Sequence, residues 1–434
     1  MGSQTSSAFL AGRRSDSAPD RSLPVSHARS LIFGSRWLWG AVGLTLLGIL
    51  LRESAVMLIG LLTLLTVGGG WLWSRSALRN VSVDRVLMTE HAFPGDQVAL
   101  QIRVMNRKLL PLAWLTIEDH LPGVLQIVEQ TETPITQRGG RILRINTAVR
   151  WYEQVIWTLH ITCPARGYYV LGPMSLRSGD LFGLYTTTQH IENVASIIVY
   201  PRIISLEHIG IAPRQLFGNL SAQRRIITDP LRIIGSRDYR PEDSSRHIHW
   251  TATARTQTLQ TKVYEPSTTP QIGIFINLDT HDPYWDGIDA ERAEHVITVA
   301  AAIAVRALAE RQTVGVYANG IAVGSDQPLR LRPSRSPGQA SAILADLARL
   351  NSIAAIDFPT FLQAEIARFP AGSTIVIVTA LITKQTAAVL ADLRQTGHWL
   401  VLVTIGDFEI PPIRGLEVIR VDEALLNPFQ ATST

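Results

Sequence analysis

The sequence has few of the residues that support redox or metal-thiolate chemistry. Among its 434 residues there is a single cysteine, Cys163, which excludes an internal disulfide and a cysteine-rich zinc site. Because a lone thiol more often fills a core than attacks a substrate, we expect Cys163 to be buried in a strand. Thiol chemistry is therefore not expected.

An excess of positive charge and catalytic sequence motifs are also missing. The formal net charge is only +4, and no dense run of Lys and Arg interleaved with aromatic residues occurs, so no nucleic-acid partner is expected. There is no phosphate-binding glycine loop, no nucleophile elbow and no His-Glu-x-x-His helix. These absences predict a protein that binds no cofactor and is not an enzyme.

Long hydrophobic runs, by contrast, are present near the N-terminus, at Trp37–Leu51 and Ser54–Trp73. The second covers 20 residues without an ionisable group, which is the length needed to cross a bilayer. The first is shorter, but flanking arginines can extend it by snorkelling. No small-residue cleavage site separates the runs, so we predict a two-helix transmembrane hairpin over 36–74 rather than a cleaved signal peptide. Gly68–Gly70 are expected to let its helices pack closely.

Arginines flank this hairpin on both sides, whereas the Arg52-Glu53 turn between the runs is neutral. The positive-inside rule therefore predicts a multi-pass protein of the cell membrane with two helices, both termini and the bulk of the chain being cytoplasmic. Residues 1–35 are rich in Ser and Arg and are predicted to form a disordered basic tail.

From 80 to 200 the hydrophobic pattern has period two, typical of half-buried strands. Val98, Leu100, Ile102 and Val104 alternate with more polar residues. Further strand-like runs, separated by Gly- and Pro-containing turns, are Val81–Leu87, Leu112–Glu118, Ile142–Val149, Val155–Ile161, Tyr168–Leu171 and Ser196–Tyr200. Many short strands with frequent turns predict an antiparallel β-sandwich domain.

The remaining residues, 205–434, are predicted to form an α/β domain. After an apolar run at Gln271–Leu278, helical and strand patterns alternate as far as Leu416–Val421, which indicates a mostly parallel, doubly wound sheet. In such sheets ligands bind at the carboxyl ends of the strands, here the loops after Leu278, Tyr317 and Thr379.

The segment Gly235–Arg255 is unusually dense in arginines, carboxylates and aromatics. Arginine pairs bidentately with carboxylates, so Arg237, Arg240, Arg246 and Arg255 could hold Asp238, Glu242 and Asp243. The residues expected either to bind a partner or to form a structural clamp are Arg237, Asp238, Tyr239, Arg240, Asp243, Arg246, His247, His249, Trp250 and Arg255.

Two histidines in this segment, His247 and His249, alternate in a strand-like stretch, which would turn both rings to one side. Such a pair can begin a metal site, but no further ligand follows at motif spacing. We therefore expect the rings to hydrogen-bond to Asp238 or Asp243 and to lie near Trp250.

Together with RGYYVLGP at Arg166–Pro173 and SGDLFGLY at Ser178–Tyr185, this segment resembles the domain of unknown function 58 family. The resemblance covers residues 80–320 and is strongest at 235–264. It implies a von Willebrand factor A-like domain and, as a partner, a MoxR-type AAA+ ATPase acting in chaperone-like assembly or maturation of other proteins. By resemblance, the protein is then an adaptor that recruits this ATPase to the membrane.

The resemblance also implies where a divalent metal would bind, on an Asp-x-Ser-x-Ser loop after the first strand of the domain. Here Asp279 fits, but the serine positions hold His281 and Pro283, and proline has no side-chain oxygen. We therefore expect no metal, although Asp282 or Asp286 could complete a divergent site. The alternative function is a metal-assisted hydrolase that uses His247, His249 and Asp279.

Overall fold

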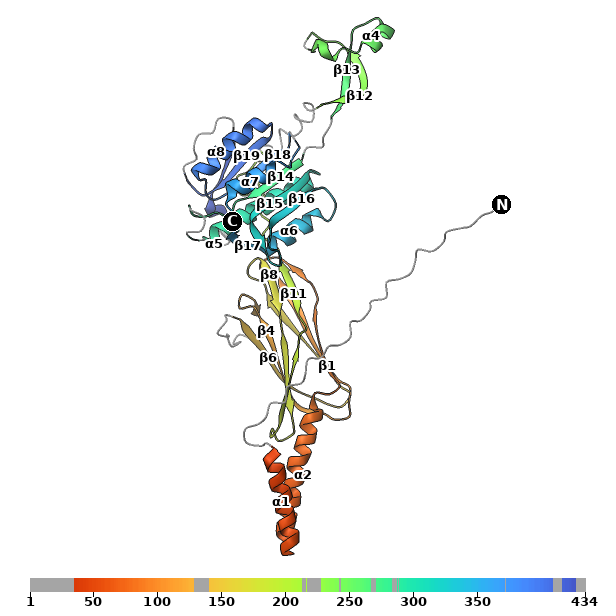
Figure 1. Cartoon of the computed structure of the whole chain (residues 1–434), viewed down its shortest axis with the longest axis vertical. Helices are drawn as coiled ribbons and strands as arrows, with labels where there is room; N and C mark the ends of the chain where they lie inside the picture. Colours follow the sequence, from red (N-terminus) through yellow and green to blue (C-terminus); the bar gives the residue numbers. More distant parts are fainter. Residues whose placement is uncertain are drawn as a thin grey trace, which may run out of the picture. The chain divides into compact units, whose positions relative to one another are not determined.

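A computed structural model describes residues 35–128, 140–212, 216, 228–241, 243–266, 271–282, 287, 289–370, 372–408 and 416–426. The chain forms two compact units (Figure 1). The first comprises Met1–Met88, Ala99–Ile161 and Val170–Ala195; the second comprises Thr89–Val98, Thr162–Tyr169 and Ser196–Thr434. The domain bounds expected from the sequence stay predictions.

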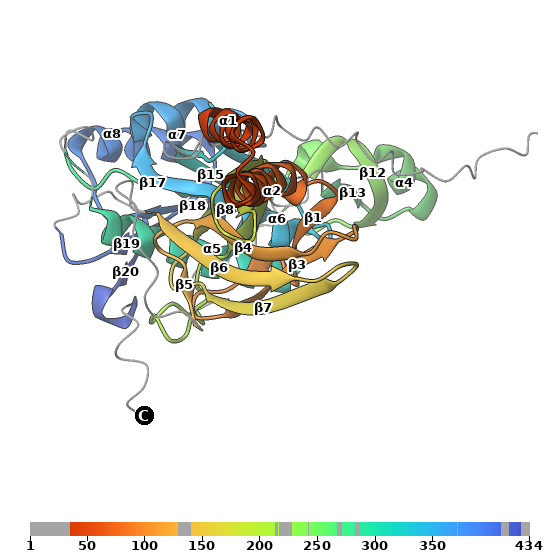
Figure 2. The same cartoon turned by 90° about the horizontal axis from the view of Figure 1, so that it is seen from below.

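The first unit begins with two apolar helices, α1 (Ser35–Leu51) and α2 (Ser54–Ala77). They lie side by side, as the view along their axes shows (Figure 2). With 24 residues and a mean hydropathy of 2.0, α2 is long and apolar enough to span a membrane, whereas α1 is shorter. The structure thus supports one helix of membrane-spanning length.

Glycines bring these helices together, but not the glycines expected. A Cβ added to Gly48 would lie 2.5 Å from the Met57 nitrogen, and one added to Gly60 would lie 2.7 Å from Thr45 Cα. Around Gly68 and Gly69 there is nothing within 4 Å. Gly68 and Gly69 therefore do not bring α1 and α2 together, and the close approach at Gly70 is to Asp180 and Tyr185 rather than to α1.

Two four-stranded sheets follow, in the strand orders β1-β3-β7-β5 and β10-β9-β4-β6. The strands of the first are β1 (Val81–Leu87), β3 (Gln97–Asn106), β7 (Gln154–Thr162) and β5 (Gln126–Ile127). Those of the second are β10 (Thr186–Ile191), β9 (Met174–Gly179), β4 (Leu112–Leu121) and β6 (Arg141–Val149). The predicted alternation in β3 is confirmed, since its four predicted apolar positions are all buried.

A third sheet joins β2 (His91–Ala92), β11 (Ala195–Val199) and β8 (Gly167–Leu171). Cys163 lies just beyond the end of β7 and is 0% exposed, so its predicted burial is confirmed although it is not within a strand. Burial raises the pKa of this thiol to about 11, which keeps it protonated and unreactive at neutral pH.

A buried ion pair connects the two four-stranded sheets. Arg85 on β1 donates to Asp119 on β4 over 2.5 Å, and to the carbonyl oxygen of Leu171 over 2.7 Å. Both charged side chains are fully buried. Burial raises the pKa of Asp119 to about 6, and the nearby Arg85 opposes that rise. Removing one partner would leave the other charge buried without compensation.

The second unit contains a seven-stranded sheet in the order β16-β15-β14-β18-β19-β20, with β17 paired to β15. Its strands are β14 (Gln271–Ile276), β15 (Thr313–Ala322), β16 (Pro328–Ser334), β17 (Leu350–Ala354), β18 (Thr374–Thr379), β19 (Trp399–Ile405) and β20 (Glu417–Val421). The pairs from β15 through β14, β18 and β19 to β20 are parallel. The predicted doubly wound α/β sheet is confirmed, but the antiparallel strands β16 and β17 were not predicted.

Helices cover both faces of this sheet (Figure 1). Residues of α5 (Ala290–Ala309) and α6 (Gln339–Arg349) belong to one apolar core, and residues of α7 (Phe358–Ile366) and α8 (Lys384–Leu393) to the other. Asp289 caps α5 by accepting from the Arg292 backbone nitrogen over 3.1 Å. Helical structure after α8 ends at Gly397 with φ of 80°, as its glycine predicts.

The unit also contains a β-hairpin of β12 (Thr228–Asp238) and β13 (Gln260–Pro266). Between these strands lie a short 3-10 helix, η1 (Ser245–His247), and α4 (Trp250–Thr256). The strand-like interpretation of His247 and His249 is therefore wrong. His247 ends η1, and His249 is the N-cap of α4, so no strand pleat turns their rings to one side.

Replacing Arg85 by Met should destabilise the first unit by about 3–5 kcal/mol, because Asp119 would remain buried without its partner. The double change Arg85→Met with Asp119→Leu should recover most of that loss, since both charges are then gone. Urea unfolding of the full chain in detergent measures both effects. If the single and double variants lose the same free energy of unfolding, the loss comes from altered packing and not from the unpaired buried charge of Asp119.

Candidate functional site

The connection between β12 and β13 and the strand ends beside it are held together by polar side chains. We call residues 237–261, without Glu242, which lies outside the described residues, the hairpin tip. Arg237 pairs with both oxygens of Asp243, at 2.7 and 2.6 Å. The same carboxylate accepts from the Arg240 backbone nitrogen at 2.9 Å and from the Thr261 hydroxyl at 3.3 Å. These contacts, above all the hydrogen bond from Arg237, lower the pKa of Asp243 to about 2.

Asp238 and Tyr239 are also used within the hairpin. Gln260 donates its side-chain amide to Asp238 over 2.6 Å. The Tyr239 backbone nitrogen donates to the Leu259 carbonyl over 2.8 Å, and its hydroxyl donates to the Asp243 carbonyl over 3.1 Å. Asp238 and Asp243 thus both bond to groups of the hairpin itself.

His249 also has a structural role. Its Nδ1 accepts from the Ala252 backbone nitrogen over 3.2 Å, which caps α4 and requires an unprotonated Nδ1. The His249 backbone nitrogen donates to the Gln260 carbonyl over 2.7 Å. The expected bond from this ring to Asp238 or Asp243 is therefore replaced by helix capping. His247 lies at the surface.

The remaining members of the predicted set have their side chains at the surface. Trp250 is 68% exposed, which is unusual for an indole. Three exposed arginines accompany it, and none forms an ion pair within the part of the chain that the structure describes: Arg240, Arg246 and Arg255. The tip therefore presents guanidinium groups and one indole to solvent from a frame that its own acids fix.

A second polar cluster lies at the carboxyl edge of the α/β sheet, where the sequence predicted a crevice. Asn319 on β15 donates to Asp279 Oδ1 over 2.8 Å and accepts from the Leu278 backbone nitrogen over 2.9 Å. Asn277 accepts from the Asp279 backbone nitrogen over 3.0 Å and donates to Thr379 at the end of β18 over 3.0 Å. The three predicted strand ends are thus brought together, with their polar groups bonded to one another.

Asp279 is 4% exposed, and burial raises its pKa to about 6, against the hydrogen bond from Asn319. His281, at the second position of the expected loop, has its Nδ1 3.2 Å from the Thr280 hydroxyl. Pro283 and Asp286 lie outside the described residues. The described donors at this loop do not fit a divalent metal, because one Asp279 oxygen is already bonded to an amide and the next position offers an imidazole.

The hydrolase alternative needs His247, His249 and Asp279 to act together. Among the residues whose structure is described, no group of three His, Cys, Asp or Glu side chains is placed to hold a metal. The His249 ring caps a helix and Asp279 belongs to the sheet-edge cluster. The geometry therefore favours a structural use of His249 and of Asp279.

Sequence reasoning missed Arg166, which it treated only as part of a recurrent motif. Its guanidinium is 6% exposed and pairs with Glu294 on α5, with one contact of 2.8 Å. It also donates to the carbonyl oxygens of Leu347 and Leu350, at 2.5 and 2.8 Å. Arg166 thereby fixes the segment 162–169 to α5 and to the α6–β17 connection. A charged residue beside aromatic residues and a turn was the only signal in the sequence.

Comparison with known proteins identifies relatives of part of the chain. Residues 235–415 match the family model described as Protein of unknown function DUF58, which confirms the resemblance over this stretch. The uncharacterized protein YeaD of Bacillus subtilis is 22% identical over 228 residues, which are 52% of each protein. The chain therefore spans about half the length of this curated relative.

Solved structures show only weak similarity. The von Willebrand factor A domain of SpRpn10 gives a TM-score of 0.26 at 9% identity, covering 37% of this chain and 94% of that one. A cohesin of Archaeoglobus fulgidus gives 0.18 at 9% identity, covering 28% and 91%. TM-scores at this level carry no conclusion about function.

Replacing Asp279 by Asn should stabilise the α/β domain at pH 8 and change little at pH 4. The folded-state pKa, about 6, exceeds the ordinary carboxyl value, so the stability contributed by this group is present at low pH and lost as pH rises through 6. A shift of two pKa units corresponds to about 3 kcal/mol at most. Urea-unfolding curves of both proteins across pH 4–8 test this; a gain independent of pH would contradict it.

Replacing Arg237 by Gln should raise the pKa of Asp243 from about 2 toward its ordinary value, because the largest cause of the shift is removed. Carbon-13 NMR of the labelled carboxyl group follows the titration. Arg246→Gln is the matched control and should leave the pKa unchanged. An Asp243 that titrates identically in both variants would mean that the ion pair does not form in solution.

Proposed function

We propose that this protein is a membrane-anchored, non-enzymatic adaptor that holds a protein partner through the hairpin tip. One observation carries the proposal: the tip uses Asp238, Asp243 and His249 for its own fold but leaves Arg246 and Trp250 exposed. Arg and Trp are residue types that dominate binding energy in protein interfaces. A frame fixed before binding also loses little conformational entropy on association.

The chemistry of the tip favours a partner with an acidic surface and a recess for an indole. Exposed guanidinium groups pair bidentately with carboxylates, and the tip has three of them beside Trp250. The proposed partner is a MoxR-type AAA+ ATPase, as the family resemblance implies, with chaperone-like assembly or maturation of other proteins as the shared task. The α/β domain, whose edge cluster is bonded internally, then acts as a rigid support.

The anchor is the α1–α2 hairpin. Support comes from the length and apolar character of α2, together with the apolar α1 that packs beside it. In this proposal both helices cross the membrane, and the arginines on either side of the hairpin place the rest of the chain in the cytoplasm. In this proposal the two four-stranded sheets that follow the anchor in the chain form the β-sandwich.

Replacing Arg246 and Trp250 by Ala should weaken the association by at least ~30-fold, since interface hot spots contribute about 2 kcal/mol or more. The measurement is co-purification of the detergent-solubilised full chain with the proposed MoxR-type AAA+ ATPase, followed by a binding titration that gives the Kd of the complex. Arg335→Ala with Ile353→Ala is the matched control, because both residues are exposed elsewhere in the second unit.

Undiminished binding by the Arg246 and Trp250 variant, with the fold intact, would contradict a docking role for the tip. A stoichiometric transition metal in the purified protein would instead favour the hydrolase.

A further inference from the structure

Three turns lie at the end of the first unit where α2 joins the sheets. They connect β3 to β4, β6 to β7 and β9 to β10. The antiparallel register places the first two together, because Leu112 pairs with Val149. The β9–β10 turn lies at the same end, because Leu115, near the start of β4, pairs with Ser178, near the end of β9. The residue that follows α2 into β1 is at this end too, since Val81 pairs with Asn106.

Hydrogen bonds fix these turns to one another and to α2. The Asn106 side-chain amide donates to the carbonyl oxygens of Leu110, over 3.0 Å, and Arg150, over 2.8 Å, joining the first two turns. Lys108 donates to the carbonyl oxygens of Ala77, at the end of α2, and Arg79, the latter over 2.9 Å. The end of the unit is thus one bonded surface and not three separate loops.

The third turn is attached to both a sheet and the helix. The Trp114 indole donates to the Asp180 carbonyl over 3.0 Å. Three residues before the end of α2, the Ser74 carbonyl accepts from the Thr187 hydroxyl over 2.9 Å. A Cβ added to Gly70 would lie 3.4 Å from Asp180 Oδ2, so the helix approaches this turn closely.

Large hydrophobic side chains point into solvent from all three turns. They are more than half exposed: Leu109 (76%), Trp151 (61%), Tyr152 (66%), Leu181 (61%) and Phe182 (66%). Scattered exposed hydrophobics are common, but five on adjoining turns at one end of a domain indicate an apolar binding surface. Trp and Tyr are also the residue types that favour the membrane–water interface.

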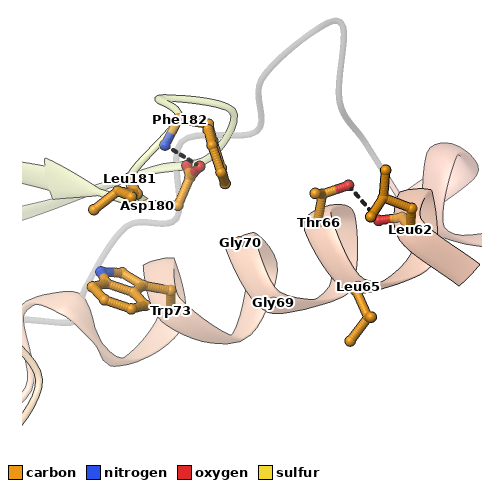
Figure 3. Close-up of a pocket in the computed structure, with 9 residues that line it drawn as sticks. All are labelled: Leu62, Leu65, Thr66, Gly69, Gly70, Trp73, Asp180, Leu181 and Phe182. Carbon is orange, nitrogen blue, oxygen red and sulfur yellow. Dashed lines mark hydrogen bonds between the residues drawn. The ribbon is translucent and has the colours of Figure 1, made fainter.

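The position of the third turn along α2 indicates what it binds. Leu181 and Phe182 border a cavity of about 280 Å³ whose other wall is α2, from Leu62 to Trp73 (Figure 3). Leu62 precedes Gly70 by eight residues, about 12 Å along a helix. The turn therefore lies beside the apolar part of α2, and whatever solvates that part of the helix also reaches Leu181 and Phe182.

The charges around the three turns are suited to anionic headgroups. Exposed cations lie beside the turns, on α2 and after it: Arg75, Arg79, Arg107 and Arg150. The two nearby acids are bonded to backbone nitrogens of the turns. Asp180 accepts from Phe182 over 3.0 Å and from Tyr185 over 2.6 Å, and Glu153 accepts from Arg150 over 2.6 Å.

We propose that these three turns insert into the interfacial layer of the phospholipid bilayer that α2 spans, with the surrounding arginines on anionic headgroups. The proposal rests on the membrane anchoring proposed above. Apolar side chains enter the headgroup–acyl boundary, and cations beside them add electrostatic attraction to anionic lipids. The bilayer then contacts the β-strand region as well as the helices.

Spin-label depth measurements on the full chain in nanodiscs of phosphatidylcholine and phosphatidylglycerol test this. Nitroxide is attached to Phe182→Cys and Trp151→Cys, and to two controls of similar exposure. Leu65→Cys on α2 reports the anchor, and Val194→Cys, after the far end of β10, reports water. Cys163 stays in place, because it is fully buried and does not label. The rate at which each nitroxide collides with oxygen, which concentrates in lipid, is compared with its rate of collision with a nickel chelate that stays in water.

The oxygen-to-nickel ratio at Phe182 and Trp151 should exceed that at Val194 several-fold and approach that at Leu65. A ratio at either turn equal to that at Val194, with the Leu65 label in lipid, overturns the inference and leaves the anchor intact. A Leu65 label in water means that the anchor fails and the inference with it. Leu181→Cys replaces Phe182→Cys if the latter does not fold.

Discussion

The joint between α2 and the strands is the contact on which the arrangement of the first unit depends. The last turns of α2 are both the end of an apolar helix and part of a protein core: Ala77 is fully buried, and Ser74 is bonded to Thr187 on β10. Lys108 occupies carbonyl groups that a helix end otherwise leaves unpaired. Because the helix enters the core without a linker, a tilt of α2 turns the sheets with it.

The hairpin tip shows how similar residues acquire different roles within a few positions. Arg237 and Arg246 have the same charge and reach, but Arg237 is held by a carboxylate on its own tip and Arg246 is not paired with any described residue. The difference comes from the 3-10 helix and α4, which carry Arg246 and Trp250 outward. Two exposed side chains are thereby presented on a short, internally bonded frame, which suits the adaptor function proposed above.

Much of the α/β domain could be predicted from sequence because its strands are buried on both faces and read as unbroken apolar runs. The strand-like interpretation around His249 failed, because a seven-residue helix is too short to show its period and its capping by an imidazole leaves no common sequence signal. The sequence predicted that the strand ends come together. It did not predict that Asn319 would hydrogen-bond to Asp279 and Leu278 there. Contacts of Arg166 and Gly60 are tertiary, and no local pattern reveals them.

The low pKa of the Asp243 carboxylate, about 2, has a further consequence if the protein is anchored in a membrane as proposed. Acidification at a bilayer surface protonates ordinary carboxyl groups long before this one, so the ion pair with Arg237 keeps both of its charges across cellular conditions. The Arg237–Asp243 contact is thus insensitive to mild acidification, whereas the capping of α4 by His249 requires an unprotonated Nδ1.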